Sequence, residues 1–247
     1  MDRKELYKSL CGGQKIMSES ELPEEVAAIR KAISEFLDCK DEKGRKIGNS
    51  KFGVYAFYDY DGEPIYVGQT EEQLRVRIRR HLTNQRTDAV AMSVLDPFEV
   101  ADIEVWPIYP EKTGKKDLPE IRRFLSRAEY TVFEKVLGES ALHAVLNEKE
   151  IPKGTKIALP ASFRARIIPD SVYELRKHPD IRIARRASTI ATLARVISER
   201  NVSKGLRQTL LTQARRLERL AKIRLDQIVG DVPLEEPGEE TGEAAEK

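Results

Sequence analysis

The protein has 247 residues, of which 40% are hydrophobic and 34% charged, which suits one large domain or two small ones. No apolar run approaches the roughly 20 residues that are needed to cross a bilayer, so no membrane-spanning helix is expected. The N-terminus lacks the apolar core of a secretion signal, and Cys11 and Cys39 are not spaced for a zinc site or a disulfide. We therefore expect a cytoplasmic protein with free thiols and no membrane contact.

The charge is unevenly distributed along the chain, although the net charge is only +2. Residues 153–230 carry 18 basic and 6 acidic residues, whereas residues 231–247 carry 1 basic and 7 acidic residues. A basic segment beside a balanced one favours a polyanionic partner such as DNA. A helical surface whose charges are merely solvated explains the charge alone about equally well.

The first half of the chain predicts a helix, a hairpin of two strands and a second helix. Apolar residues recur at helical spacing before the hairpin and again after it. The two strands are joined by a turn in which Gly62 is free to take a positive φ. The expected bounds are 22–37 for the first helix, 52–58 and 63–67 for the strands, and an end near Leu82 for the second helix.

The second half predicts one more strand followed by helices. Residues 100–109 are rich in residues that favour strands, and residues 119–137 repeat apolar residues at helical spacing. Gly154 and three prolines interrupt residues 151–169, so we place a domain boundary there. Beyond it, two apolar stripes on either side of residues 201–205 predict a helical hairpin. The stripes are Ile183, Ala187, Ile190, Leu193, Ala194 and Ile197, and Leu206, Leu210, Ala214, Leu217 and Ala221.

These elements predict an α+β fold. We expect an antiparallel three-stranded sheet flanked by helices, with an N-terminal helical extension and a C-terminal helical hairpin. The expected parts of the chain are an N-terminal helical extension (1–50), the sheet domain (51–150), a basic helical domain (151–230) and a disordered acidic tail (231–247).

Short motifs in and after the hairpin follow one another in a fixed order: Gly53-Val54-Tyr55, Tyr66-Val67-Gly68, Arg77, His81, Glu129 and Asn147. They resemble the motifs of the GIY-YIG nuclease superfamily over about residues 51–148. Each motif is weak alone because it occurs often by chance, but six positions in the family's order make a strong signal. Valine replaces isoleucine in both motifs, and Gln69 stands where other members can carry a lysine, which argues against a lysine-assisted mechanism.

The resemblance implies hydrolysis of phosphodiester bonds. Tyr55 is the implied general base, and Tyr66 would hydrogen-bond the phosphate or the attacking water. Arg77 and His81 are four residues apart and so project from one helix face, where Arg77 would hold the phosphate and His81 would orient the water or a tyrosine hydroxyl. Without the shared motifs, the tyrosines would be read as strand residues that pack their rings, and the histidine as structural.

Glu129 is the implied ligand of Mg²⁺ or Mn²⁺, hard cations that accept carboxylate, water and phosphate oxygens. Glu134 is the rival on the same helix, but five residues turn a helix through about 500°, so the two carboxylates cannot share a face. A site with one carboxylate is expected to bind the ion well only when DNA is present. Asn147 would brace the site by hydrogen bonding, or would simply end a helix or turn.

We expect the basic C-terminal helices to grip DNA phosphates, because small catalytic domains of this kind usually gain affinity from appended elements. The alternative is a hairpin that packs on the nuclease domain or forms a homodimer. Neither zinc-finger spacing nor a helix-turn-helix signature is present, so the target sequence cannot be read from the chain. The residues expected to contact DNA are Arg75, Arg80, Arg182, Arg185, Arg186, Arg215 and Arg219.

Two functions fit this sequence. The leading hypothesis is a metal-dependent DNA endonuclease with a tyrosine, arginine and glutamate site, in restriction or phage defence. The second is a catalytically inactive nucleic-acid-binding or assembly protein on a nuclease fold. The intact set of six family residues favours the enzyme, since a degenerate site usually loses a member. Cutting both strands of DNA would require a homodimer or two sequential nicks.

Overall fold

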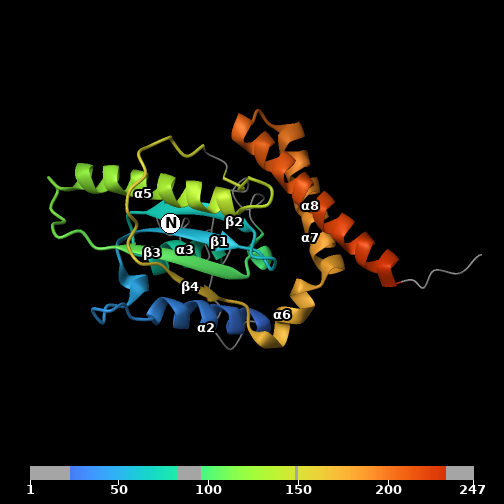
Figure 1. Cartoon of the computed structure of the whole chain (residues 1–247), viewed down its shortest axis with the longest axis horizontal. Helices are drawn as coiled ribbons and strands as arrows, with labels where there is room; N and C mark the ends of the chain where they lie inside the picture. Colours follow the sequence, from blue (N-terminus) through green and yellow to red (C-terminus); the bar gives the residue numbers. More distant parts are fainter. Residues whose placement is uncertain (1–22, 83–95, 148–149, 232–247) are drawn as a thin grey trace, which may run out of the picture.

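The computed structural model describes residues 23–82, 96–147 and 150–231. At its centre is an antiparallel sheet of four strands in the order β2-β1-β3-β4 (Figure 1). The edges of the sheet are therefore β2 and β4. The strands are β1 (Phe52–Tyr58), β2 (Pro64–Thr70), β3 (Asp102–Ile108) and β4 (Phe163–Arg166).

Helices cover both faces of this sheet. Helices α2 and α3 pack on one face, and α5 packs on the other (Figure 1). The helices are α2 (Glu24–Asp38), α3 (Leu74–Leu82), α5 (Leu118–Glu139), α6 (Asp170–Lys177), α7 (Pro179–Glu199) and α8 (Lys204–Asp231), with 3-10 turns η2 (Ile47–Asn49) and η3 (Pro97–Glu99).

Strand β1 is buried along its whole length because the sheet is covered on both faces. Successive side chains of a strand point to opposite faces. Tyr55 and Phe57 accordingly join the core on the α2–α3 side, while Val54 and Ala56 join the core on the α5 side. Strand β1, which carries Gly53-Val54-Tyr55, is buried because it lies between β2 and β3 in a sheet that helices cover on both faces.

The turn between β1 and β2 has the predicted form. Gly62 has a φ of 74°, a conformation that glycine adopts without strain. The Asp59 carboxylate accepts hydrogen bonds from the main-chain N–H groups of Asp61 and Glu63 at 2.9 and 3.0 Å. This side-chain-to-main-chain pattern is typical of aspartate in turns, and it fixes the register in which Tyr55 faces Gly68.

The predicted α+β fold is confirmed, but the sheet has a fourth strand where three were predicted. The extra strand β4 lies within residues 151–169, where we placed a domain boundary. The segment crosses the outside of α5, where Ile157 N–H donates to Thr131 Oγ1 at 3.1 Å, and then pairs with β3 (Figure 1). A strand of four residues is too short to show a readable alternation between prolines.

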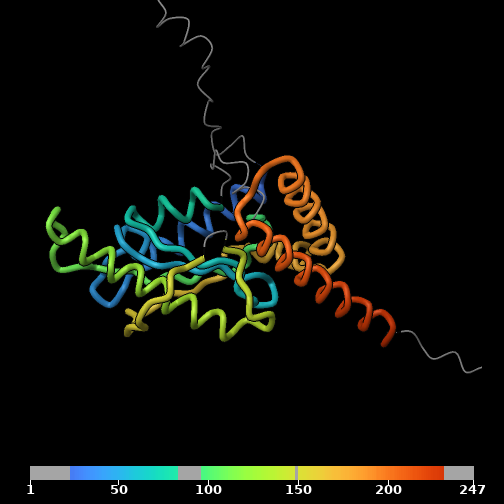
Figure 2. The backbone as a smooth tube through the Cα atoms, turned by 90° about the horizontal axis from the view of Figure 1, so that it is seen from above, coloured from blue at the N-terminus to red at the C-terminus, as the bar shows by residue number. Residues whose placement is uncertain are grey.

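The predicted C-terminal helical hairpin is confirmed as α7 and α8, which pack against each other at one end of the sheet (Figure 2). Its buried face differs from the predicted stripes. Leu193 and Leu206 are buried, but four stripe alanines are exposed, and buried polar residues replace them. The exposed alanines are Ala187, Ala194, Ala214 and Ala221.

The predictions for both ends of the chain fall outside the described residues. The acidic tail after Asp231 and the first 22 residues lie outside the described residues. The division into four domains and the cytoplasmic location stay predictions. Among the described helices, none is long and apolar enough to cross a membrane.

Candidate active site

The hydroxyl of Tyr55 is the point at which the first motif meets helix α3. It lies 3.1 Å from His81 Nε2, and it accepts a hydrogen bond from Arg77 Nε at 3.2 Å. The sequence spacing of four residues places Arg77 and His81 on one side of α3, as predicted. Because Tyr55 and His81 are buried, this arrangement is held by packing as well as by hydrogen bonds.

Tyr66 of the second motif belongs to the same group of rings. It stacks on Phe57 with ring centroids 6.0 Å apart, and its centroid lies 5.4 Å from that of His81. Tyr66 is partly exposed, whereas Tyr55 has no exposed surface. Of the two motif tyrosines, Tyr66 is therefore the one that solvent reaches.

Gly68 leaves the space that Tyr55 occupies. A Cβ atom at this position would lie 2.7 Å from the Tyr55 hydroxyl oxygen and 2.8 Å from the Tyr66 ring. Contacts this short are not tolerated, and the Tyr55 ring has no room to move in a packed core. The glycine of the second motif thus has a direct role in placing the tyrosine of the first.

Glu129 approaches from α5, on the opposite face of the sheet from Arg77. The Glu129 carboxylate accepts a hydrogen bond from the main-chain N–H of Gln69 on the edge strand β2, and it lies within electrostatic reach of Arg77. Burial raises the pKa of Glu129 to about 7, and the Gln69 N–H and the charge of Arg77 offset part of that rise. An edge strand makes this possible because its outer N–H groups are not used by the sheet.

Asn147 covers the same edge of β2. Its Oδ1 accepts from Val67 N–H at 3.1 Å, and its Nδ2 donates to Val67 O at 2.7 Å. The neighbouring Leu146 N–H donates to Ile65 O at 2.7 Å. The outer edge of β2 is thus bonded by Leu146 at Ile65, by Asn147 at Val67 and by Glu129 at Gln69. Asn147 therefore supports the strand that carries Tyr66 and Gly68.

The donor set suits a hard divalent cation that keeps most of its water. Among the described residues, no group of three His, Cys, Asp or Glu side chains is arranged to hold a metal. Glu129 supplies one carboxylate, and its raised pKa shows that Gln69 and Arg77 compensate only part of the cost of a charge at this buried position. Mg²⁺ and Mn²⁺ accept such a site when water and substrate phosphate complete the coordination.

The arginines expected to contact DNA fall into different environments. Arg75 bonds Asp38 at 2.6 Å, and Arg80 bonds Glu72 at 2.6 Å, so both are engaged within the protein. Arg185 is partly buried beside the Phe98 ring. Arg215 and Arg219 are exposed on α8, and their role on DNA stays a proposal.

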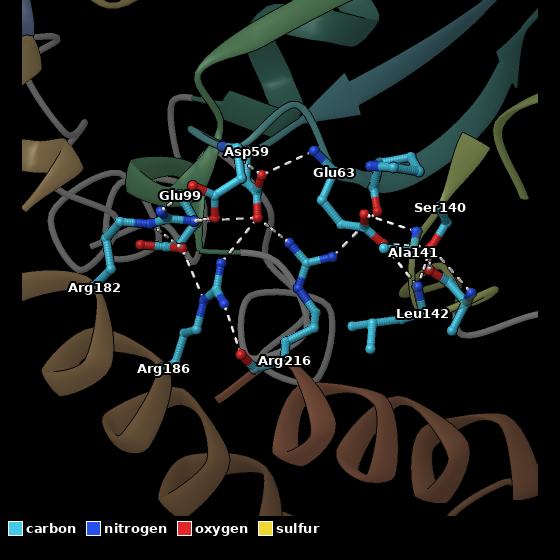
Figure 3. A network of polar contacts seen from close by, with 12 residues as sticks. Asp59, Glu63, Glu99, Ser140, Ala141, Leu142, Arg182, Arg186 and Arg216 are labelled. Atoms are coloured by element: carbon cyan, nitrogen blue, oxygen red, sulfur yellow. Dashed lines mark hydrogen bonds and ion pairs between the residues drawn. The ribbon is translucent and has the colours of Figure 1, made fainter. Parts of the chain in front are cut away.

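Arg182 and Arg186 do not lie on a DNA-facing surface, which corrects the prediction made for them. They are 1% and 5% exposed, and their guanidinium groups reach the Asp59 carboxylate at 3.2 and 2.9 Å (Figure 3). Arg216 of α8 reaches the same oxygen at 2.6 Å. Buried charges are paired in proteins, and here three arginines share one aspartate at the turn of the β1–β2 hairpin.

This buried ion network, which also contains Glu99, was missed in the sequence. Arg186 Nε lies 3.1 Å from a Glu99 oxygen, and burial raises the pKa of Glu99 despite the charges of Arg186 and Arg182. One sequence signal was available: the acidic turn at residues 59–63 has the opposite charge to the basic segment at 153–230. That complementarity favours pairing within the chain as much as an external polyanion.

Comparison with known proteins agrees with the geometry. Residues 51–113 match the family model of the GIY-YIG catalytic domain. Neither the curated proteins nor the solved structures contain a match to the chain. The chain therefore carries a catalytic domain of a nuclease family that cleaves phosphodiester bonds. Tyr55, Tyr66, Arg77 and His81 lie within the matched range, and Glu129 and Asn147 lie beyond it.

Proposed function

We propose that this protein is a metal-dependent DNA endonuclease. Its active site would consist of Tyr55, Tyr66, Arg77, His81, Glu129 and Asn147. The observation that carries the proposal is the convergence of Arg77 and His81 on the Tyr55 hydroxyl. The family match supports phosphodiester hydrolysis. DNA as the substrate and Mg²⁺ or Mn²⁺ as the ion are part of the proposal.

Tyr55 is the proposed general base. A free phenol has a pKa of about 10, so its proton must be drawn away before it can accept one from water. His81 Nε2 is placed to take that proton, and Arg77 stabilises negative charge on the phenolate oxygen. Since Tyr55 is buried, the substrate phosphate must first attract Arg77 and open a path for the water. Tyr66, partly exposed beside His81, is the second candidate for the base.

Arg77 is the proposed phosphate ligand. Its Nε is bonded to Tyr55, while its two terminal nitrogens form no hydrogen bond with any residue in the described part of the chain. A guanidinium group can therefore hold the tyrosine and present a two-pronged donor to a phosphate. The developing charge on the phosphoryl oxygens would be stabilised by this fixed cation.

Glu129 is the proposed ligand of the divalent ion. When bound, the ion would polarise the phosphoryl group and assist departure of the 3′ oxygen. The Gln69 N–H orients the carboxylate for this role, and Asn147 holds the strand that supplies that N–H. A role in restriction or phage defence, and a homodimer that cuts both strands, extend the proposal by analogy alone.

The test is cleavage of supercoiled plasmid DNA with Mg²⁺, with Mn²⁺ and with a chelator. We expect the wild type to cut only with metal, and Glu129→Ala to lose at least 100-fold in rate. Glu134→Ala is the matched control, since Glu134 lies on the same helix and pairs with Lys156 instead. Nicked circles would indicate single-site action, and linear product paired sites.

A second candidate function, an inactive nucleic-acid-binding protein, is separated by the same assay. If the wild type cuts no DNA with either ion but binds DNA with a steep salt dependence, the catalytic proposal is wrong. Equal activity in wild type and Glu129→Ala would remove Glu129 from the metal site.

A further inference from the structure

The basic residues of α8 divide into an inner and an outer set. Arg216 points inward and is buried in the ion network with Asp59. The outer set is exposed, and its side chains form no ion pair or hydrogen bond with the residues that the structure describes. Its members are Lys204, Arg207, Arg215, Arg219 and Lys222.

The outer set lies on one face of α8, with the exposed Leu211 between Arg207 and Arg215. At 100° per residue, its five members fall within an arc of about 120° around the helix. From Arg207 to Lys222 the face is about 23 Å long. Glu218 is the single acidic residue between Lys204 and Lys222. Glu218 lies within the same arc, but unlike the inner arginines the five cations form no ion pair with the described residues.

This face borders the candidate active site. A cavity of about 830 Å³ separates α8 from α5. Arg215 lies on its α8 wall, Tyr130, the neighbour of Glu129, lies on its α5 wall, and Asn147 lines it as well. A polymer lying along the outer face of α8 would thus pass close to Asn147, which bonds the edge of β2.

We propose that the outer face of α8 binds the phosphate backbone of duplex DNA without reading its sequence. This inference rests on the proposed function and names the part of the substrate that this face holds. Phosphates repeat every 3.4 Å along each strand, so a face of about 23 Å spans about seven of them. Single strands are held by aromatic side chains on which bases stack, and α8 contains no aromatic residue. The chemistry of the face therefore fits duplex backbone.

The experiment measures binding of the full-length protein to a fluorescent DNA duplex at 50 to 200 mM salt, in chelator to prevent cutting. The test variant is Arg207→Gln/Arg215→Gln/Arg219→Gln/Lys222→Gln. Each lost phosphate contact reduces the slope of log K against log salt by about 0.9, so the slope should fall by about 3 to 4. At 100 mM salt we expect affinity to fall at least 100-fold.

The matched control removes four exposed charges in the segment before α5 and in its N-terminal part: Lys112→Gln/Lys115→Gln/Lys116→Gln/Arg123→Gln. It should change the slope by less than 1. An unchanged slope in the α8 variant, or an equal fall in the control, would overturn the inference. So would tighter binding of wild type to single-stranded than to duplex DNA. Because all eight positions are exposed, both variants should fold, which circular dichroism checks, and Arg215→Glu provides a single-site test.

Plasmid cleavage separates this inference from the proposed function. If the α8 variant binds and cuts like the wild type, the inference fails and the nuclease stands. If the wild type cuts nothing but the α8 variant loses duplex binding, the nuclease proposal fails and the binding face stands.

Discussion

At the scale of single residues, Gly68 and Tyr55 act as one unit. Alanine at position 68 would place its Cβ 2.7 Å from the Tyr55 hydroxyl oxygen, so Tyr55 must leave its position between Arg77 and His81. We predict that Gly68→Ala lowers the rate of plasmid cleavage on the order of 100-fold, as displacement of a reacting group by about 1 Å does.

Gly138→Ala is the control for that substitution, because a Cβ at Gly138 meets no atom within 4 Å. This variant should cut at the wild-type rate and gain about 0.5–1 kcal/mol in stability, since alanine favours a helix over glycine. Wild-type cleavage by Gly68→Ala would show that the observed position of Tyr55 is not required for the reaction.

Glu129 gives a pH-dependent prediction for the metal-free protein. Its pKa is about 7 in the folded chain because of burial, against an ordinary value of 4.5. Below pH 4.5 the group is largely neutral in both states. Between about pH 4.5 and 7 the unfolded carboxyl ionises while the folded one stays protonated, so the wild type loses stability over this window, and the loss is constant above it. We predict that Glu129→Gln is more stable than the wild type by up to about 3 kcal/mol at pH 8, by less than about 1 kcal/mol at pH 5, and not at all at pH 4.

Thermal unfolding in chelator measures this difference. Glu134→Gln, which removes a partly exposed ion pair with Lys156, should show no comparable gain at pH 8. A constant difference between wild type and Glu129→Gln from pH 5 to 8 would contradict the assigned burial of the carboxylate.

At the scale of elements, the ion network fastens the C-terminal helices to the catalytic hairpin. Asp59 is the first residue of the β1–β2 turn. Its carboxylate forms ion pairs with Arg182 and Arg186 of α7 and with Arg216 of α8 (Figure 3). Arg216 also donates to Pro64 O, the first residue of β2, at 3.2 Å. The helix pair therefore holds the strand that carries the second motif.

Removing the shared Asp59 carboxylate should weaken the attachment of α7 and α8 to the hairpin. Asp59→Asn leaves three buried guanidinium groups around a neutral side chain, so we predict a loss of about 3–5 kcal/mol in the free energy of unfolding. Asp61→Asn is the matched control, because Asp61 is exposed and pairs with Arg182 alone, and it should cost less than about 1 kcal/mol. Denaturant unfolding compares the two, and equal losses would show that the network does not depend on Asp59.

At the scale of the whole molecule, the contacts join the predicted sheet domain and the predicted helical domain into one unit. β4 pairs with β3, and Leu193 and Leu206 of the helix pair enter the core that contains Tyr55. We predict that residues 23–231 unfold in a single transition, with a calorimetric enthalpy equal to the van't Hoff enthalpy. Two separated transitions in calorimetry would instead support the division at residue 150.

The local elements and the motif residues could be predicted from the sequence because each depends on short-range pattern. The β1 strand was predicted with the bounds that the structure has, since alternation and turn chemistry are encoded in neighbouring residues. The separation of four residues between Arg77 and His81 likewise placed both side chains on one helix face. The family motifs then identified six candidate site residues by their type and order in the sequence, without information on the distances between them.

Which charges are buried, and which distant residues come together at the candidate site, followed from the packing of the folded chain. Arg182 and Arg215 look alike in sequence, yet one is buried against Asp59 and the other is exposed on α8, because burial depends on the element packed opposite. The pairing of β4 with β3 and the hydrogen bond from Gln69 N–H to Glu129 likewise join residues far apart in the chain. The helices, the strands and the motif residues could be read from the sequence, because local pattern encodes them. The contacts between them could not, because contacts between distant residues leave no periodic trace in one sequence.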